Sequence, residues 1–313
     1  MNNKIEMQKA NTGFLRKRWN VRGLYLLAFL PVVYVFIFNY VPMYGVLMAF
    51  KRFQPRLGVW NSPWVGLYNF QRLFDSPNFL GILRNTLVLS IYGLIAGFPF
   101  PILMAICINH FFLKKFSKAV QTITFAPHFL SAVILVGFIG QILSMRMGIV
   151  NNVLRTMGFS PVNFMGIPSL FPHVYIWSGI WQNTGYSAII YISALVSVDV
   201  NLHEAAIIDG ATIWQRIWYI DLATIRPIII IMLILSMGGI LSTNFEKAFL
   251  LQNPLNTETS EVISTYVYKV GLASTRPDYS YGTAIGLFQN VIGVILVLTV
   301  NKIADALTGE GMF

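Results

Sequence analysis

Charged residues are scarce in this chain. Only 11% of its 313 residues are Asp, Glu, Lys or Arg, whereas 56% are hydrophobic. A soluble globular chain carries about 25% charged residues. The chain therefore lacks the residues that a water-facing surface requires, and we expect membrane lipid to be its main solvent.

Cysteine is almost absent as well. The single Cys107 lies in an apolar run, which excludes an intramolecular disulfide and a cysteine metal cluster and predicts a buried thiol. The four histidines, His110, His128, His173 and His203, are scattered without the spacing of metal ligands. We interpret them as structural or interfacial, and we expect no catalytic residue and no metal site.

Six segments contain no Asp, Glu, Lys or Arg and are long enough, or nearly so, for a membrane-spanning helix of about 20 residues. They run from Leu24 to Phe50, Asn85 to Leu113, Ala119 to Met145, His173 to Val198, Pro227 to Phe245, and Gly282 to Asn301. The first is longer than a signal-peptide core of about 7–15 residues, so we expect it to remain as a span. Pro99 and Pro101 are expected to kink the second span, and Pro127 the third. The predicted fold is all-α, a polytopic membrane protein with six transmembrane helices.

Basic residues orient these spans, because Lys and Arg concentrate in short cytoplasmic connections. They gather at Lys4, Lys9, Arg16, Lys17, Arg18 and Arg22, and again at Lys114, Lys115 and Lys118. We therefore expect both chain ends in the cytoplasm and no nucleic-acid partner for the net charge of +10. The predicted organisation is a cytoplasmic leader at 1–23, a transmembrane domain at 24–303 with a cytoplasmic loop at 199–226, and a cytoplasmic tail at 304–313. The segments Lys51 to Arg84, Arg146 to Pro172 and Glu246 to Tyr281 are then external.

The cytoplasmic loop is itself patterned as a helical hairpin. Asn201 followed by Glu204 resembles a capping box and predicts the start of a short helix. Gly210 is placed to end that helix in a left-handed conformation. A second amphipathic stretch over 213–220 follows, and the chain is expected to re-enter the membrane at Pro227.

The order of residues in this loop resembles the EAA loop of ABC importer permeases. Glu204 precedes two alanines, and Gly210 follows after three further residues. The resemblance implies a coupling helix that sits in a cleft of a separate ATPase. The residues that it implies for coupling are Glu204, Ala205, Ala206, Asp209, Gly210, Ala211, Arg216 and Pro227. The family pattern has proline directly after Leu222, where this sequence has Ala223, so we expect the second helix to enter the fifth span with less of a kink.

Other segments resemble one branch of this family, the polysaccharide-type permeases of complex-oligosaccharide importers. They are Tyr40 to Phe50, Ser62 to Phe70, Arg84 to Thr86, Pro127 to Phe129, and Thr265 to Tyr268. The resemblance implies a type I importer permease in a bacterial cytoplasmic (inner) membrane. It also implies a second permease, an ATPase dimer, and an extracellular or periplasmic solute-binding protein that delivers an oligosaccharide. The chain has no Gly-x-x-x-x-Gly-Lys-Ser/Thr phosphate loop, so ATP and Mg²⁺ are expected on the partner ATPase and no cofactor on this chain.

Aromatic faces and uncharged polar groups commonly hold sugars in apolar pockets. The candidate pathway residues of this kind are Trp177, Trp181, Asn183, Tyr186, Tyr191, Phe245, Gln289 and Asn290. Aromatic residues also gather at membrane interfaces, and polar residues also join helices, so a structural role stays open for each. Glu246 and Lys247 adjoin at a span end and are interpreted as a solvated pair, with a role in a gate as the alternative.

Two other functions are compatible with a polytopic membrane protein. A membrane-embedded sugar transferase would need acids, histidines or metal ligands gathered near one membrane face, and this sequence has few acids. An ATP-independent carrier would favour charged residues within spans, and the predicted spans lack them. The sequence leaves open whether a transported sugar is neutral or acidic.

Overall fold

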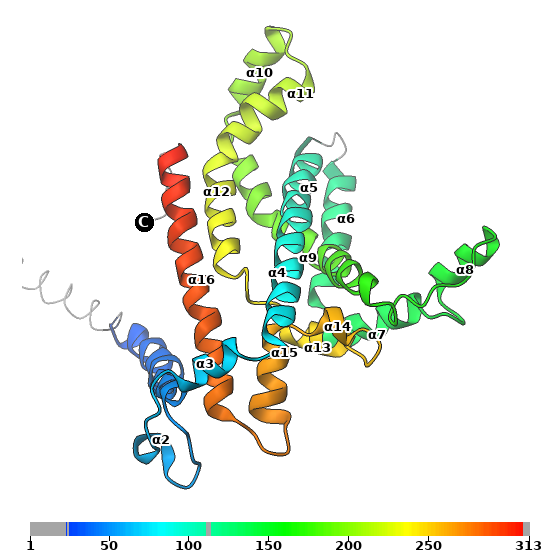
Figure 1. Ribbon diagram of the computed structural model, residues 1–313. Coiled ribbons are helices and arrows are strands. Elements are labelled where there is room, and N and C mark those ends of the chain that lie inside the picture. The colour runs from blue at the N-terminus through cyan, green and yellow to red at the C-terminus, as the bar shows by residue number, and fades with distance from the viewer. Residues whose placement is uncertain (1–22, 24, 111–113, 309–313) are drawn as a thin grey trace, which may run out of the picture.

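The computed structural model describes residues 23, 25–110 and 114–308 (Figure 1). The regular structure of these residues is helical, with one isolated bridge between extended segments at Lys51 and Trp64. Most of the basic leader at 1–23 and the connection at 111–113 lie outside the described residues, so the predictions made for them are not addressed. The helices, with π and 3₁₀ stretches marked η, are η1 Phe36–Tyr40, η2 Val41–Phe50, α2 Gly58–Asn61, α3 Tyr68–Phe74, α4 Phe79–Gly97, α5 Pro99–His110, α6 Lys114–Phe125, η3 Ala126–Phe129, α7 Ala132–Ile142, α8 Ile149–Thr156, η4 Pro168–Leu170, α9 Phe171–Val196, α10 Val200–Ile208, α11 Ile213–Arg216, η5 Ile217–Asp221, α12 Leu222–Gly238, α13 Phe245–Leu251, α14 Thr257–Ser260, α15 Ile263–Tyr268, η6 Lys269–Ala273 and α16 Tyr279–Thr308.

The described helices supply the expected number of membrane spans. Four are long and apolar enough to cross a bilayer: Tyr25–Phe50, Phe79–His110, Ile213–Gly238 and Tyr279–Ala306. Two bent pairs bring the total to six if each pair is one span: Lys115–Phe129 with Ala132–Ile142, and Pro168–Val196 with Val200–Ile208. The all-α, six-span prediction therefore agrees with the structure.

Proline positions have unequal effects on these helices. Pro127 lies in the 3₁₀ turn Ala126–Phe129, and directly after this turn the third span bends: Lys115–Phe129 and Ala132–Ile142 differ in direction by 104°. Ser131 then caps α7 by accepting a hydrogen bond from the backbone N–H of Ile134. By contrast, α4 and α5 meet at Phe98, next to Pro99, and still form one span.

The fifth span differs from its predicted limits at both ends. A continuous helix runs from Ile213 to Gly238, so Pro227 lies inside α12 and does not begin a helix. A proline removes one backbone hydrogen bond, which π or 3₁₀ adjustments compensate in membrane helices, and the π-helical η5 lies directly upstream. Phe245 does not end this span either; it begins the separate short helix α13, which Asn244 caps.

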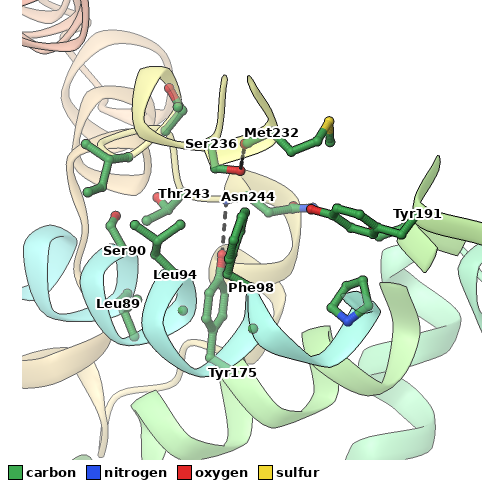
Figure 2. A pocket seen from close by; sticks show the side chains of 17 residues that line it. Leu89, Ser90, Leu94, Phe98, Tyr175, Tyr191, Met232, Ser236, Thr243 and Asn244 are labelled. Carbon is green, nitrogen blue, oxygen red and sulfur yellow. Dashed lines mark hydrogen bonds between the residues drawn. The ribbon is translucent and has the colours of Figure 1, made fainter. Parts of the chain in front are cut away.

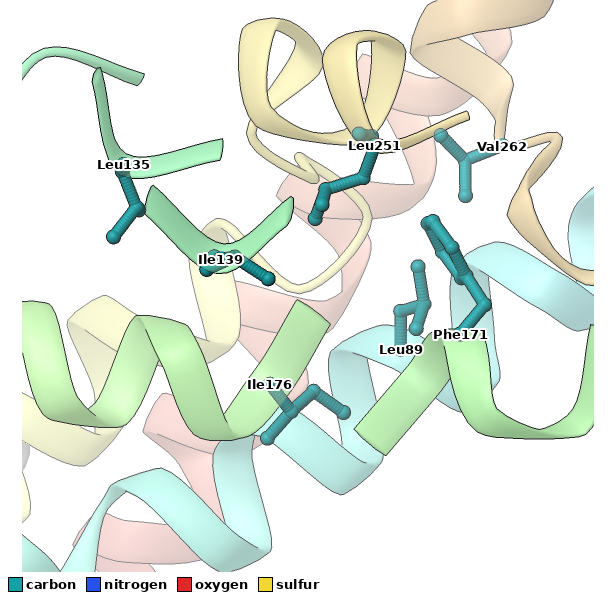
Figure 3. Packing of buried hydrophobic residues seen from close by; sticks show 8 residues of the cluster. Leu89, Leu135, Ile139, Phe171, Ile176, Leu251 and Val262 are labelled. Atoms are coloured by element: carbon teal, nitrogen blue, oxygen red, sulfur yellow. The ribbon is translucent and has the colours of Figure 1, made fainter. Parts of the chain in front are cut away.

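Two apolar clusters hold the central helices together. The first joins α4, α7, α9 and α13 and extends to Val262 just before α15 (Figure 3). The second joins α5, α9 and α12, with Ala105, Ala188 and Ile225 fully buried. The long helix α9 takes part in both clusters, so its position fixes the elements around it. Cys107 is exposed, contrary to the prediction, because α5 packs through its neighbours Ala105 and Ile106.

The backbones of α6 and α9 are in close contact where these two helices cross. A Cβ atom added at Gly185 would lie 2.2 Å from the carbonyl oxygen of Thr124, which is backbone and cannot rotate away. The crossing of these two helices therefore requires glycine at this position.

We predict that Gly185→Ala lowers the melting temperature of the detergent-purified protein, because overpacking of this kind costs about 1–3 kcal/mol. Gly286→Ala is the matched control, since a Cβ atom at that helical glycine meets nothing within 4 Å. Equal melting temperatures for the two variants would show that α6 moves freely away from α9.

Candidate functional site

The hairpin formed by α10 and α11 extends beyond the long helices at one end of the molecule, the end at which α16 also finishes (Figure 1). Its first helix begins at Asp199, whose side chain accepts a hydrogen bond from the N–H of Asn201. The predicted capping box of Asn201 and Glu204 is therefore wrong. Asp199 is the residue with extended backbone before the helix, and a cap requires that position. Glu204 is instead exposed on the helix surface.

Gly210 ends α10 as predicted. Its φ of 78° is left-handed. The N–H of Ala211 donates to the carbonyl of Ala206, and the N–H of Gly210 donates to that of Ile207. This pair of bonds is a Schellman motif, which satisfies the last carbonyls of a helix. The bend is therefore a defined turn and not a loose loop.

A second cap follows at once. Thr212 accepts a hydrogen bond from the N–H of Gln215, and the side chain of Gln215 accepts one from the N–H of Thr212. This capping box begins α11. Threonine followed by glutamine at this spacing is a signal in the sequence from which this capping box could have been predicted.

The outer surface of the hairpin is apolar and open. Ile208, Trp214, Trp218 and Tyr219 are between 67% and 85% exposed. Four of the residues predicted for coupling are exposed: Glu204, Ala205, Asp209 and Gly210. The other four are half-buried: Ala206, Ala211, Arg216 and, within α12, Pro227. An exposed apolar surface with acidic neighbours is typical of a protein contact.

A buried carboxylate fixes the base of the hairpin. Asp221 is fully buried in η5, and its Oδ2 lies 2.6 Å from Nε2 of His110 at the end of α5. Its Oδ1 lies 3.3 Å from Nε2 of His203, which is on α10. Three separate elements therefore meet at one carboxylate, and one of them, α5, is distant from the other two in sequence. These histidines are scattered in the sequence, and only the folded chain brings them together. Among the described residues, no group of three or more His, Cys, Asp or Glu could hold a metal ion.

A cavity of about 370 Å³ lies among α4, α9, α12 and the segment 239–244 (Figure 2). Tyr175 of α9 points across it, and its hydroxyl accepts a hydrogen bond from the backbone N–H of Asn244. Ser90, Ser236 and Thr243 add hydroxyl groups to the lining. Its size falls in the range of about 300–1,000 Å³ that is usual for small-molecule sites.

A second cavity of about 260 Å³ shares Tyr175 and Asn244 with the first. Gln182, Asn183 and Lys247 also line it. The two cavities offer hydroxyl, amide and aromatic groups beside apolar walls, and these are the groups that hydrogen-bond and stack on sugars.

The predicted pathway residues divide between these cavities and other places. Tyr191 lines the first cavity, and Asn183 lines the second. Trp177 and Trp181 line a separate apolar groove that α7 also lines. Tyr186 stacks on His128, with the ring centres 3.9 Å apart.

The remaining predicted residues lie on other elements. Gln289 and Asn290 line a groove that α12 and α16 form. Phe245 packs against Phe249 and Tyr268. Tyr175 and Ser236, which line the first cavity, were not predicted from the sequence, because a single tyrosine or serine on an apolar helix carries no signal of its own.

Comparisons with known proteins agree with this architecture. Residues 85–309 match the family model described as "Binding-protein-dependent transport system inner membrane component". The polygalacturonan/rhamnogalacturonan transport system permease protein YteP of Bacillus subtilis (strain 168) is 40% identical over 290 residues, which cover 93% of this chain and 90% of YteP.

Solved structures agree as well. The chain is similar to one in the crystal structure of a bacterial ABC transporter that imports the acidic polysaccharide alginate, with 41% identity, a TM-score of 0.83, and coverage of 91% of this chain and 96% of the other. A second alginate transporter structure, in complex with a periplasmic protein bound to an alginate pentasaccharide, matches with 39% identity, a TM-score of 0.84, and coverage of 92% and 96%. The chain therefore belongs to the family of binding-protein-dependent transport system inner membrane components, the permeases of ABC importers.

Proposed function

We propose that this chain is the permease subunit of an ATP-driven importer that moves an oligosaccharide delivered by an external solute-binding protein. The observation that carries the proposal is the match to the family over residues 85–309 together with an open cavity lined by hydroxyl and amide groups. The similar transporters import polysaccharide fragments, and one is bound to a loaded periplasmic protein. The family match favours neither a sugar transferase nor an ATP-independent carrier.

The hairpin of α10 and α11 is the proposed contact with an ATPase dimer, which would bind ATP and Mg²⁺. The hairpin lies apart from the other helices (Figure 1) and exposes apolar side chains. Its second helix continues without interruption through η5 into the fifth span. A push on the tip would therefore be transmitted along one helix to the cavity, which Met232 and Ser236 of α12 line.

The position of the hairpin also bears on orientation. If it meets an ATPase, this end of the molecule is cytoplasmic, and the end of α16 lies on the same side. The proposed orientation therefore places the C-terminus in the cytoplasm. A second permease is proposed to close the pathway, because the cavities of this chain are not enclosed.

Gly210→Val should abolish coupled uptake. A left-handed conformation costs a non-glycine residue about 1–2 kcal/mol, and a β-branched side chain tolerates it least. Gly210→Asn is the matched control, because Asn adopts this conformation more readily; a Cβ atom here meets nothing within 4 Å, so only the backbone is tested. Uptake and stimulated ATP hydrolysis are measured in proteoliposomes that hold the whole transporter. Equal uptake by the two variants would contradict the role of the bend.

The contact of Asp221 with His203 should appear as an energetic coupling. Asp221→Ala and His203→Ala are each expected to reduce uptake, and the double variant should lose less than the product of the two effects, as residues in contact do. Uptake rates of the three variants and the unaltered transporter form the cycle. Strictly multiplicative losses would show that the carboxylate does not position α10.

Ser236→Leu should reduce oligosaccharide uptake at least tenfold, because it places an apolar side chain in the cavity. Leu235→Phe on the same helix is the control, since Leu235 is exposed and does not line the cavity. Both are assayed in the assembled transporter, with subunit composition checked by co-purification. Normal uptake by Ser236→Leu would remove this cavity from the proposed pathway.

A further inference from the structure

Lys247 is a buried cation that lines the second cavity. It belongs to the first turn of α13 and is only 4% exposed, whereas the adjoining Glu246 is exposed. The solvated pair predicted from the sequence is therefore wrong for Lys247. Because α13 packs on α7 and α9 through the cluster of Figure 3, its first turn faces α9 and not water.

No ion pair joins Lys247 to a carboxylate within the part of the chain that the structure describes. The described cations Arg72 and Lys269, by contrast, pair with Asp278 and Glu261. Buried charges are normally paired, because the loss of water around an isolated charge is costly. Burial accordingly lowers the pKa of Lys247, which lies outside the long spans, to about 7.

The ammonium group is held in place from the α9 side. Its Nζ donates a hydrogen bond of 2.7 Å to the carbonyl of Tyr175 and lies 4.9 Å from the centre of the Tyr175 ring. An ammonium group has three donors, so this bond leaves donors for a ligand. Gly179 leaves room beside it, since a Cβ atom there would lie 3.0 Å from Nζ.

The surroundings of Lys247 in the cavity are neutral. Gln182, Asn183 and Asn244 line the same space and offer amide groups. A fixed cation among uncharged hydrogen-bonding groups is complementary to a sugar that carries one negative charge. A carboxylate bound at Nζ would supply the missing partner and favour the charged ammonium form.

We propose that Lys247 binds the carboxylate of a uronate-containing oligosaccharide on its way through the cavity, and so selects acidic over neutral sugars. The inference rests on the proposed function, because it takes this cavity as part of the pathway. Tyr175 positions the ammonium group, and the amides of Gln182 and Asn183 hydrogen-bond the neutral hydroxyls.

The test compares two substrates with the same sugar backbone, one with charged carboxylates and one with neutral methyl esters in their place. Labelled oligogalacturonates and their methyl esters are supplied with the solute-binding protein to the whole transporter in proteoliposomes. Lys247→Met should reduce uptake of the acid at least tenfold and leave uptake of the ester within about twofold, as expected for loss of a buried charge-assisted bond. Lys247→Arg, which keeps the charge, should retain more acid uptake than Lys247→Met.

Gly179→Ala serves as the second variant if Lys247→Met fails to assemble. It keeps the cation but crowds Nζ, and it should lower acid uptake more than ester uptake. Equal losses for acid and ester in the assembled variants would make Lys247 a structural residue and overturn the inference. Unaltered transporter that imports only neutral oligosaccharides would overturn it while leaving the proposed function intact. Failure to import any oligosaccharide would overturn both.

Discussion

A bilayer offers no hydrogen-bonding partner to a peptide backbone, and this constraint governs the whole architecture. Every backbone group in a lipid-exposed segment must be satisfied within the chain, which only helices or closed barrels achieve. The described spans are accordingly helices, and their outward surfaces carry large apolar side chains such as Leu27, Phe29 and Leu298. The same apolar solvent accounts for the low content of charged residues in the sequence.

Interruptions of these helices occur where side chains replace the lost backbone bonds. Ser131, Asp199, Thr212 and Asn244 each accept a hydrogen bond from an N–H at the start of a helix. The breaks that they cap create the features to which we assign coupling and sugar binding. The hairpin of α10 and α11 begins at two of them, and the short helix α13 that carries Lys247 begins at another. Irregular backbone at these places is therefore built into the fold.

Two charged side chains, those of Asp221 and Lys247, are buried within the described part of the chain. Asp221 is fully buried and ties α5 and α10 to the start of the fifth span. Lys247 is buried beside the second cavity. One lies at the base of the hairpin and the other beside the cavity, and the uninterrupted fifth span extends from the first toward the second. The fifth span thus connects the hairpin to which we assign coupling with the first cavity, without a flexible joint between them.

Structural features that depend only on neighbouring residues were predicted well from the sequence. The long charge-free segments predicted six spans, Pro127 a break, and Gly210 a left-handed bend, because each depends on neighbouring residues alone. Predictions were less reliable where a sequence pattern fits two different local structures. Asn201 and Asp199 are both good caps, and only the direction of the incoming chain selected Asp199. By contrast, the second amphipathic stretch predicted over 213–220 is helical from Ile213, where a capping box begins it.

The sequence by itself therefore determined the solvent of this protein, its helical class, the number of its spans and the bend of its hairpin. Its resemblance to ABC importer permeases also followed from the order of residues in one loop. Only the tertiary structure decided which polar side chains meet. His110, His203 and Asp221 come from three separate elements, and Tyr175 and Lys247 are 72 residues apart. Which side chains are buried or paired depends on how the helices pack. The spacing of residues along the chain does not indicate which face of α9 contacts α13.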